Sequence, residues 1–153
     1  MADETVPASP AELFAGFFAE ATAGDRPFGH REHVHLTWLA VRRCGRSAAI
    51  DVVSAGIRRT ARYAGVPQKY NATVSRAWVE VIAHHARVSP TDDFDAFATA
   101  NPELLDKRLL TRFYSSARLA GGEARTGWVL PDREPFPFSP PPAGRWPRTS
   151  HRR

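Results

Sequence analysis

The sequence is divided into helical segments by residues that end helices, and this division constrains the fold more than any other feature of the sequence. Apolar side chains recur at helical spacing until a glycine or a Ser-Pro step interrupts them. The stretches between these stops are 9–23, 30–44, 47–64 and 71–88. The first begins with a capping box, because Ser9 stands three residues before Glu12. No segment alternates as a strand does, so we predict helices throughout.

Three shorter helices are expected further along the chain. One is capped by Thr91, and another runs from 101 to 113 with a bend near Asp106. A last short helix is expected around 118–126. The fold class that follows is all-α, a single-domain bundle of five to seven helices over residues 9–130.

Both ends of the chain are expected to lie outside this bundle. Residues 1–8 are short of apolar side chains and are predicted to be disordered. Prolines in 131–153 are too dense for a helix or a sheet, so this segment is predicted to be an extended or disordered Pro/Arg-rich tail. Phe136, Phe138 and Trp146 could anchor part of the tail on the domain.

Composition limits the partners of the chain. It has 21 basic and 16 acidic residues, a net charge of +5, but the tail holds five arginines against two acidic residues. The tail therefore carries +3 and the first 130 residues only +2, which argues against a surface that coats nucleic acid. The single cysteine, Cys44, suits a reducing compartment, and no apolar run has membrane-spanning length. We expect a cytoplasmic protein that binds neither nucleic acid nor a membrane.

Histidines at the start of the second stretch give the strongest chemical signal. His30 and His33 are three residues apart and share a helix face, which Thr37 extends by one turn. The helix dipole disfavours positive charge here, so both imidazoles are expected to be neutral, as a general base or a metal ligand requires. We assign His33 as the catalytic base, His30 as its partner and Thr37 as a substrate-binding residue. Solvated surface histidines are the alternative interpretation.

This assignment requires no cofactor. A metal held by His30 and His33 is a minority alternative, because the metalloprotease motif spaces its histidines four residues apart and not three. A third ligand would have to come from His84, His85 or Asp106. The sequence contains no glycine-rich phosphate loop and no dinucleotide-binding fingerprint.

Further polar residues interrupt the apolar patterns at two places. Tyr70, Asn71 and Thr73 stand at the start of the fourth stretch, where hydroxyl and amide groups could orient a substrate. A capped helix start is the alternative. Asp106 interrupts a leucine pattern and, if partly buried, would pair with a histidine, although a solvated carboxylate is more usual. We include all four residues in the substrate-binding set.

A helix-turn-helix is a further interpretation. The segment 61–66 followed by 73–76 has the order of residues found in repressor motifs. However, Thr73 follows Gly65 by eight positions where about five are usual, and Pro67 breaks the tight turn. A DNA-binding regulator is therefore the weakest of the functional hypotheses.

Four motifs occur in a fixed order along the chain. They are Phe28-x-His30-x-x-His33-x-x-x-Thr37-Trp38, Tyr70-Asn71-x-Thr73 with Trp78, Leu104-Leu105-Asp106-Lys107-x-Leu109-Leu110 with Tyr114-Ser115, and Trp128-x-x-Pro131-Asp132. In this combination the chain resembles an uncharacterised family of small bacterial all-helical proteins, over about residues 28–132. The resemblance implies neither a reaction nor a cofactor. It implies that Asn71 stands where the family usually has histidine, and that polar positions on separate helices form one pocket.

These observations predict a small enzyme that uses histidine-based general acid–base chemistry on a small organic substrate, as a lyase, isomerase, cyclase or hydrolase does. Bacterial specialised metabolism is the expected setting, because the Arg-, Ala- and Pro-rich composition suggests a GC-rich genome. The first alternative is a non-catalytic small-molecule-binding or accessory protein, and the second is a DNA-binding transcriptional regulator. The expected partner is a small-molecule ligand, and homo-oligomerisation is left open.

Overall fold

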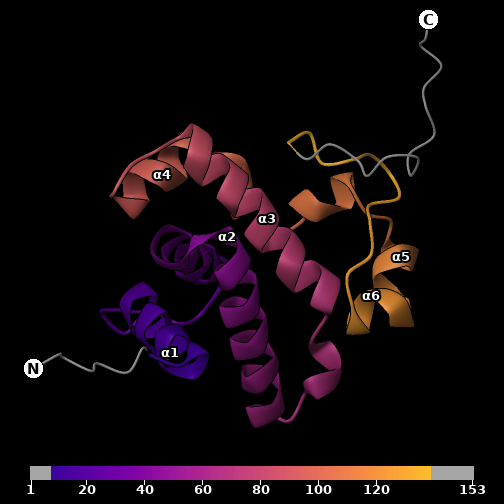
Figure 1. Cartoon of the computed structure of the whole chain (residues 1–153), viewed down its shortest axis with the longest axis horizontal. Coiled ribbons are helices and arrows are strands. Elements are labelled where there is room, and N and C mark those ends of the chain that lie inside the picture. The colour runs from indigo at the N-terminus through magenta and orange to yellow at the C-terminus, as the bar shows by residue number, and fades with distance from the viewer. Residues whose placement is uncertain (1–7, 139–153) are drawn as a thin grey trace, which may run out of the picture.

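Helices account for all the regular secondary structure of residues 8–138, the part of the chain that the computed structural model describes. The predicted all-α fold class is thereby confirmed. The α-helices are α1 (Pro10–Ala21), α2 (His30–Tyr63), α3 (Ala72–Val88), α4 (Phe94–Ala100), α5 (Ser116–Ala120) and α6 (Gly122–Thr126), and the 3-10 turns are η1 (Pro67–Lys69), η2 (Pro102–Leu105) and η3 (Leu109–Arg112) (Figure 1). Residues 1–7 and 139–153, with Trp146, lie outside the described part.

The longest helix, α2, is bent at the point where a stop between two helices was predicted. Gly45 has φ 84° and ψ 161° within an otherwise helical run. Residues with a Cβ atom rarely adopt a positive φ, so glycine is the residue that allows the bend. The parts of α2 before and after Gly45 run in different directions (Figure 1). Because of the bend, α2 contacts α1, α3, η1 and η2.

The apolar stripes of the predicted helices meet in one core. Phe14 and Phe17 of α1, Trp38 of α2, Trp78 of α3 and Phe97 of α4 are all buried in a single cluster. The predicted capping box is also present, with paired side-chain and backbone hydrogen bonds at the start of α1. The periodicity of the sequence thus identifies both the helices and the faces that they bury.

The structure corrects the helix predicted over 101–113, which consists of the two 3-10 turns η2 and η3. Asp106 between them has an extended backbone with ψ 109°, so no α-helical ladder crosses it. Its carboxylate accepts a hydrogen bond from the backbone N–H of Arg108 at 2.9 Å, a local bond that competes with the helix. A smaller correction concerns α4, which is capped by Asp93 and not by Thr91.

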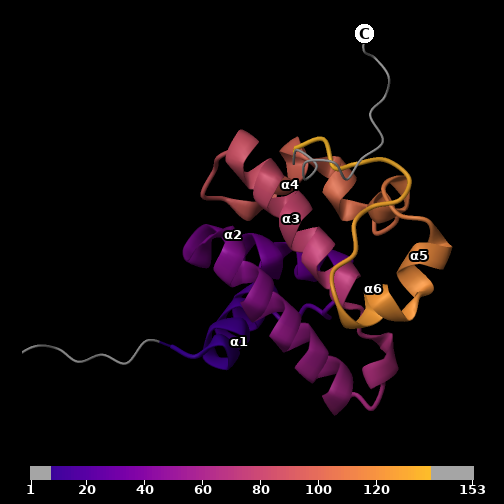
Figure 2. The same cartoon turned by 45° about the vertical axis from the view of Figure 1, so that its right-hand side comes forward.

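The chain continues to pack against the domain after the last helix. Residues 127–138 contain no helix and run upward from α6 (yellow in Figure 2). Phe136 is buried, with its ring centroid 4.8 Å from that of Phe113 and 5.2 Å from that of Phe138. The expected anchoring by Phe136 and Phe138 is confirmed. The packed chain therefore reaches beyond the predicted boundary at residue 130.

The close contact between α1 and α2 can be tested at Gly56. A Cβ atom there would lie 2.1 Å from Cδ1 of the buried Phe14. We expect Gly56→Ala to lower the free energy of unfolding by about 1–3 kcal/mol, because the ring would have to move. The control is Gly16→Ala on the exposed face of α1, where an added Cβ has no heavy atom within 4 Å. It should raise the free energy of unfolding by roughly 0.5–1 kcal/mol, since alanine is the better helix former. Equal stabilities in chemical denaturation would contradict this packing.

Candidate functional site

The structure brings His30 and His33 together at the start of α2, as their spacing predicts. Their ring centroids are 6.3 Å apart and their planes differ by 25°. His30 is the first residue of α2, and its ring packs edge-on against Trp78 of α3 at 4.9 Å. The backbone N–H of Gly29 donates to the carboxylate of Glu32 at 3.0 Å and fixes the helix start. The pair is thus held between α2 and α3.

A backbone carbonyl sets the tautomer of His30. Nε2 of its ring lies 2.9 Å from the carbonyl oxygen of Leu104 in η2. A carbonyl can only accept, so Nε2 carries the proton and Nδ1 is an acceptor when the ring is neutral. An imidazole oriented by an acceptor on one nitrogen, with the other nitrogen available, is the usual arrangement of a histidine base.

His33 is held neutral by its surroundings. Burial lowers the pKa of His33 to about 4, and the neighbouring His30 contributes a smaller part of the shift. Neither ring nitrogen of His33 has a hydrogen-bond partner among the described residues. In this part of the chain, Oγ1 of Thr37 is the only side-chain polar atom that is both enclosed and unpaired. The nitrogens of His33 are therefore not enclosed and keep contact with the solvent. A pKa this low also makes His33 a weak base at neutral pH.

Apolar side chains border the histidine pair at the surface. Phe28 is 36% exposed, and its ring centroid lies 6.4 Å from that of His33. Leu105 is 37% exposed and directly follows the residue whose carbonyl contacts His30. These are two of the four large apolar side chains that residues 8–138 expose. The position of Phe28 beside His33 gives the surface an apolar rim there.

Thr37 lies one turn after His33 and has an unused hydroxyl. The residue is fully buried, and its Oγ1 has no hydrogen-bond partner within residues 8–138. Threonines in helices usually bond to the carbonyl one turn back, as Thr60 does with Gly56 at 2.9 Å. An unpaired buried hydroxyl costs about 1–3 kcal/mol. Thr37 therefore carries a hydrogen-bonding capacity that the fold itself does not use.

Asn71 and Thr73, predicted to bind substrate, make hydrogen bonds that fasten the fold. The hydroxyl of Thr73 donates to the carbonyl of Gly127 at 2.6 Å and accepts from the N–H of Val129 at 3.1 Å. Asn71 caps α3, and its Nδ2 donates to the carbonyl of Leu119 at 2.8 Å. None of these partners belongs to the histidine pair. Both residues join the start of α3 to the chain around α5 and α6.

Other polar residues of the motifs also make hydrogen bonds that hold the fold together. The backbone N–H and hydroxyl of Ser115 donate to the two carboxylate oxygens of Asp132 at 2.7 and 2.6 Å, and these bonds lower the pKa of that carboxyl. The hydroxyl of Tyr114 donates to the carbonyl of Val129 at 2.7 Å, and burial raises its pKa. Arg118 donates from Nε to the carbonyl of Leu130 at 3.0 Å. The polar motifs thus attach the segment after α6 to the domain.

Tyr70 and Asp106 also have partners outside the histidine pair. The guanidinium carbon of Arg58 lies 6.0 Å from the ring centroid of Tyr70, near the C-terminal end of α2. Asp106 is exposed, and its carboxylate accepts from the backbone N–H and from Nε of Arg108 at 2.9 and 3.3 Å. These bonds hold the pKa of Asp106 below its usual range. Asp106 is therefore a solvated carboxylate that caps a turn, the more usual of the two interpretations, and it does not pair with a histidine.

The candidate third metal ligands do not join His30 and His33. Nδ1 of His85 lies 2.8 Å from Oδ1 of Asn101, and His84 stacks on Phe138 with 4.6 Å between ring centroids. Residues 8–138 contain no group of three His, Cys, Asp or Glu side chains placed to hold a metal ion.

In the same range, no helix is both long and apolar enough to span a membrane.

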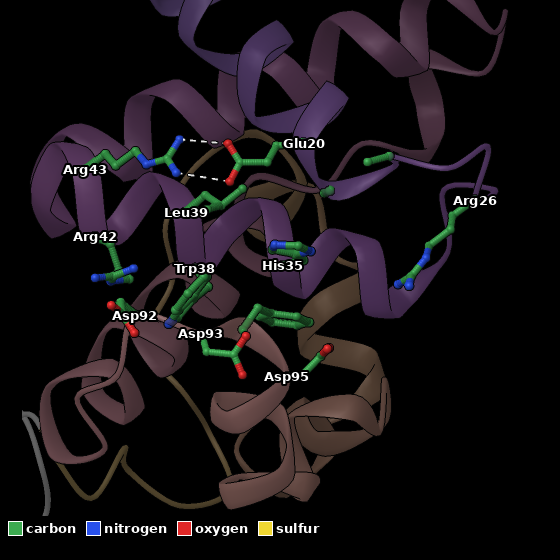
Figure 3. Close-up of a pocket in the computed structure, with 13 residues that line it drawn as sticks. Glu20, Arg26, His35, Trp38, Leu39, Arg42, Arg43, Asp92, Asp93 and Asp95 are labelled. Atoms are coloured by element: carbon green, nitrogen blue, oxygen red, sulfur yellow. Dashed lines mark hydrogen bonds and ion pairs between the residues drawn. The ribbon is translucent and has the colours of Figure 1, made fainter.

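A pocket that the sequence analysis missed lies between α1, α2 and the start of α4 (Figure 3). It has a volume of about 360 Å³. His35 stacks face to face on Phe94 at 4.1 Å, and burial lowers the pKa of His35. Arg43 donates two hydrogen bonds to the carboxylate of Glu20 at 2.9 and 3.0 Å. The charged lining residues are Arg26, Arg42, Arg43, Glu20, Asp92, Asp93 and Asp95. Opposite charges nearly cancel, so the pocket has no strong preference for a cation or an anion.

Comparison with known proteins adds no assignment to these sites. No family model matches the chain, and neither a curated protein nor a solved structure shows significant similarity to it. The resemblance drawn from the motifs therefore stays a prediction, and a functional assignment depends on the geometry alone.

The two buried threonines should respond oppositely to the same substitution. We expect Thr73→Val to lower the free energy of unfolding by about 1–3 kcal/mol, because a partly buried carbonyl and a partly buried N–H lose their partner. Thr37→Val should leave stability unchanged or raise it by about 1 kcal/mol, since it removes an unpaired hydroxyl. Thermal and chemical denaturation measure both. A strong destabilisation by Thr37→Val would show that its hydroxyl has a partner in the folded protein.

The low pKa of His33 predicts a loss of stability in mild acid. In the unfolded chain a histidine binds its proton near pH 6.5, whereas folded His33 binds it near pH 4. The folded state is therefore fully favoured above pH 6.5 and is weakened as the pH falls toward 4. Since the ring is partly exposed, the loss is at most about 3 kcal/mol.

Urea denaturation between pH 7 and pH 4 measures this loss. His33→Gln should remove most of it, whereas the control His84→Gln, at a histidine whose pKa is lowered less, should leave most of it in place. The same pH dependence in His33→Gln as in the wild-type protein would contradict the assignment to His33.

Proposed function

We propose that the protein is a small enzyme that performs general acid–base chemistry on a small organic substrate at His30 and His33. The observation that carries the proposal is the 2.9 Å contact between Nε2 of His30 and the carbonyl of Leu104. It fixes one tautomer and leaves Nδ1 as a proton acceptor, without any cofactor. We place this chemistry in the cytoplasm of a bacterium and in specialised metabolism, a setting that the single cysteine and the Arg-rich composition support.

The geometry favours an exchange of the two roles assigned from the sequence. His30 is the better placed base, because the Leu104 carbonyl orients its ring and leaves Nδ1 as the acceptor. His33, with a pKa of about 4, stays neutral and donates or accepts a hydrogen bond to the substrate. The exposed ring of Phe28 beside His33 favours a substrate with an apolar part. The enclosed hydroxyl of Thr37, one turn away, supplies a partner for a bound water.

A comparison of metabolite consumption tests the proposal. The purified full chain is incubated with a bacterial metabolite extract, and substrates and products are followed by mass spectrometry. His30→Gln keeps an amide N–H for the Leu104 carbonyl but has no basic nitrogen, so we expect turnover to fall by about 10²–10⁴-fold. The control His84→Gln should retain wild-type turnover. Unchanged turnover in His30→Gln would contradict the catalytic assignment.

Binding without turnover is the second candidate function. The low pKa of His33 favours it, because a neutral imidazole beside an apolar rim binds a ligand well but accepts protons poorly. The two candidates differ in the same experiment. An enzyme depletes a metabolite, whereas a binding protein retains it unchanged through gel filtration, and His33→Gln lowers the amount retained.

A further inference from the structure

We infer a second binding site, for a small phosphorylated molecule, at the C-terminal end of α2. A pocket of about 360 Å³ lies there, lined by Arg58 and Arg62 of α2, Pro67 of η1, Tyr70, and Arg125 and Thr126 of α6. It is separate from the histidine pair, because His30 begins α2 whereas Arg62 stands next to its last residue. The inference does not depend on the catalytic proposal.

The charge of this pocket is uncompensated. Three arginines line it, and no carboxylate does. Several arginines elsewhere in the described chain are paired with acids, as Arg43 is with Glu20 and Arg46 with Glu80. Arg58, Arg62 and Arg125 have no carboxylate oxygen within 4.0 Å in the described residues. Guanidinium groups gathered around one concavity repel one another, so an anion bound there would relieve the repulsion.

Two of the cationic groups are held in place before any ligand binds. Nη2 of Arg125 donates to the backbone carbonyl of Gln68, which ties α6 to η1. The guanidinium carbon of Arg58 lies 6.0 Å from the ring centroid of Tyr70. Tyr70 lines the pocket, and its phenol makes no hydrogen bond within residues 8–138, so it remains able to donate. Planar guanidinium donors beside a free phenol suit the oxygens of a phosphate group.

The size and walls of the pocket indicate a small ligand. Its volume of about 360 Å³ lies in the range of small-molecule sites. Tyr70 and Pro67 supply apolar surface for an organic part attached to the phosphate. The first 130 residues carry a net charge of only +2, less than a surface that coats nucleic acid would need. These features favour a phosphomonoester or a diphosphate over a nucleic acid.

The other arginine-lined pocket is less suited to an anion. It has a volume of about 390 Å³ and contains Arg46, Arg76 and Arg87 beside Trp128 and two phenylalanines. However, the buried carboxylate of Glu80 already accepts from Arg46 at 2.9 Å and from Arg76 at 3.1 Å. This carboxylate occupies the two guanidinium groups and would repel an incoming anion. The pocket at the end of α2 contains no such acid.

Titration of the full chain with defined anions tests this inference. Pyrophosphate, adenosine monophosphate and inorganic sulfate are added at constant ionic strength, and binding is measured by calorimetry. We expect pyrophosphate and the nucleotide to bind more tightly than sulfate, because they carry more charge or an added organic part. Arg62→Gln and Arg58→Gln should each weaken binding about tenfold, since each removes a charge-assisted hydrogen bond. Tyr70→Phe should weaken it severalfold.

The matched control is Arg59→Gln, which removes the same charge from the adjacent residue of α2, outside the pocket lining. It should change the affinity less than twofold, and circular dichroism should show that all four variants are folded. An equal loss in Arg59→Gln would show unspecific attraction and overturn the inference. Absence of pyrophosphate and nucleotide binding at millimolar concentration would also overturn it. Tighter binding of a short DNA duplex than of either small phosphate, lost in Arg62→Gln, would replace it with a nucleic-acid surface.

Discussion

The bend at Gly45 determines where both candidate sites lie. A straight helix of 34 residues would be about 51 Å long, whereas a domain of this size is roughly 35–40 Å across. A positive φ at a glycine allows the chain to turn, so that both parts of α2 remain packed. The first part holds His30 against Trp78 of α3. The second part brings Gly56 against Phe14 and carries Arg58 to Tyr70.

Much of the fold could be predicted because the ends of its helices are set by neighbouring residues. Ser9 with Glu12 begins α1, and Gly45 interrupts α2 at the predicted place. The prediction failed at 101–113, where the leucine pattern is helical but Asp106 bonds to the backbone of Arg108. The energies of the two outcomes differ by little, since a local side-chain bond replaces a helical one. Apolar spacing alone does not separate a helix from two 3-10 turns that bury the same leucines.

The candidate site was only partly predictable, because sequence patterns do not identify distant partners. The spacing of His30 and His33 places them on one face of a helix, but the carbonyl that orients His30 comes 74 residues later. The same limit explains Thr73, whose hydroxyl bonds to a carbonyl 54 residues away and fastens the segment after α6. A hydroxyl that binds substrate and one that fastens the fold leave the same mark in the sequence. The two kinds of hydroxyl differ in whether the fold supplies a hydrogen-bond partner, as it does for Thr73 but not for Thr37.

The local compensation of charged groups also matters more than the net charge of the chain. A net charge of +5 could indicate nucleic-acid binding, yet several arginines are neutralised by carboxylates within hydrogen-bond distance. At the start of α2 the important groups are two imidazoles, and burial keeps that of His33 neutral. At the end of α2 three guanidinium groups share a concavity without an acid. A neutral, apolar-rimmed site and an uncompensated cationic pocket attract different chemical groups. The two ends of α2 are therefore suited to two different ligands.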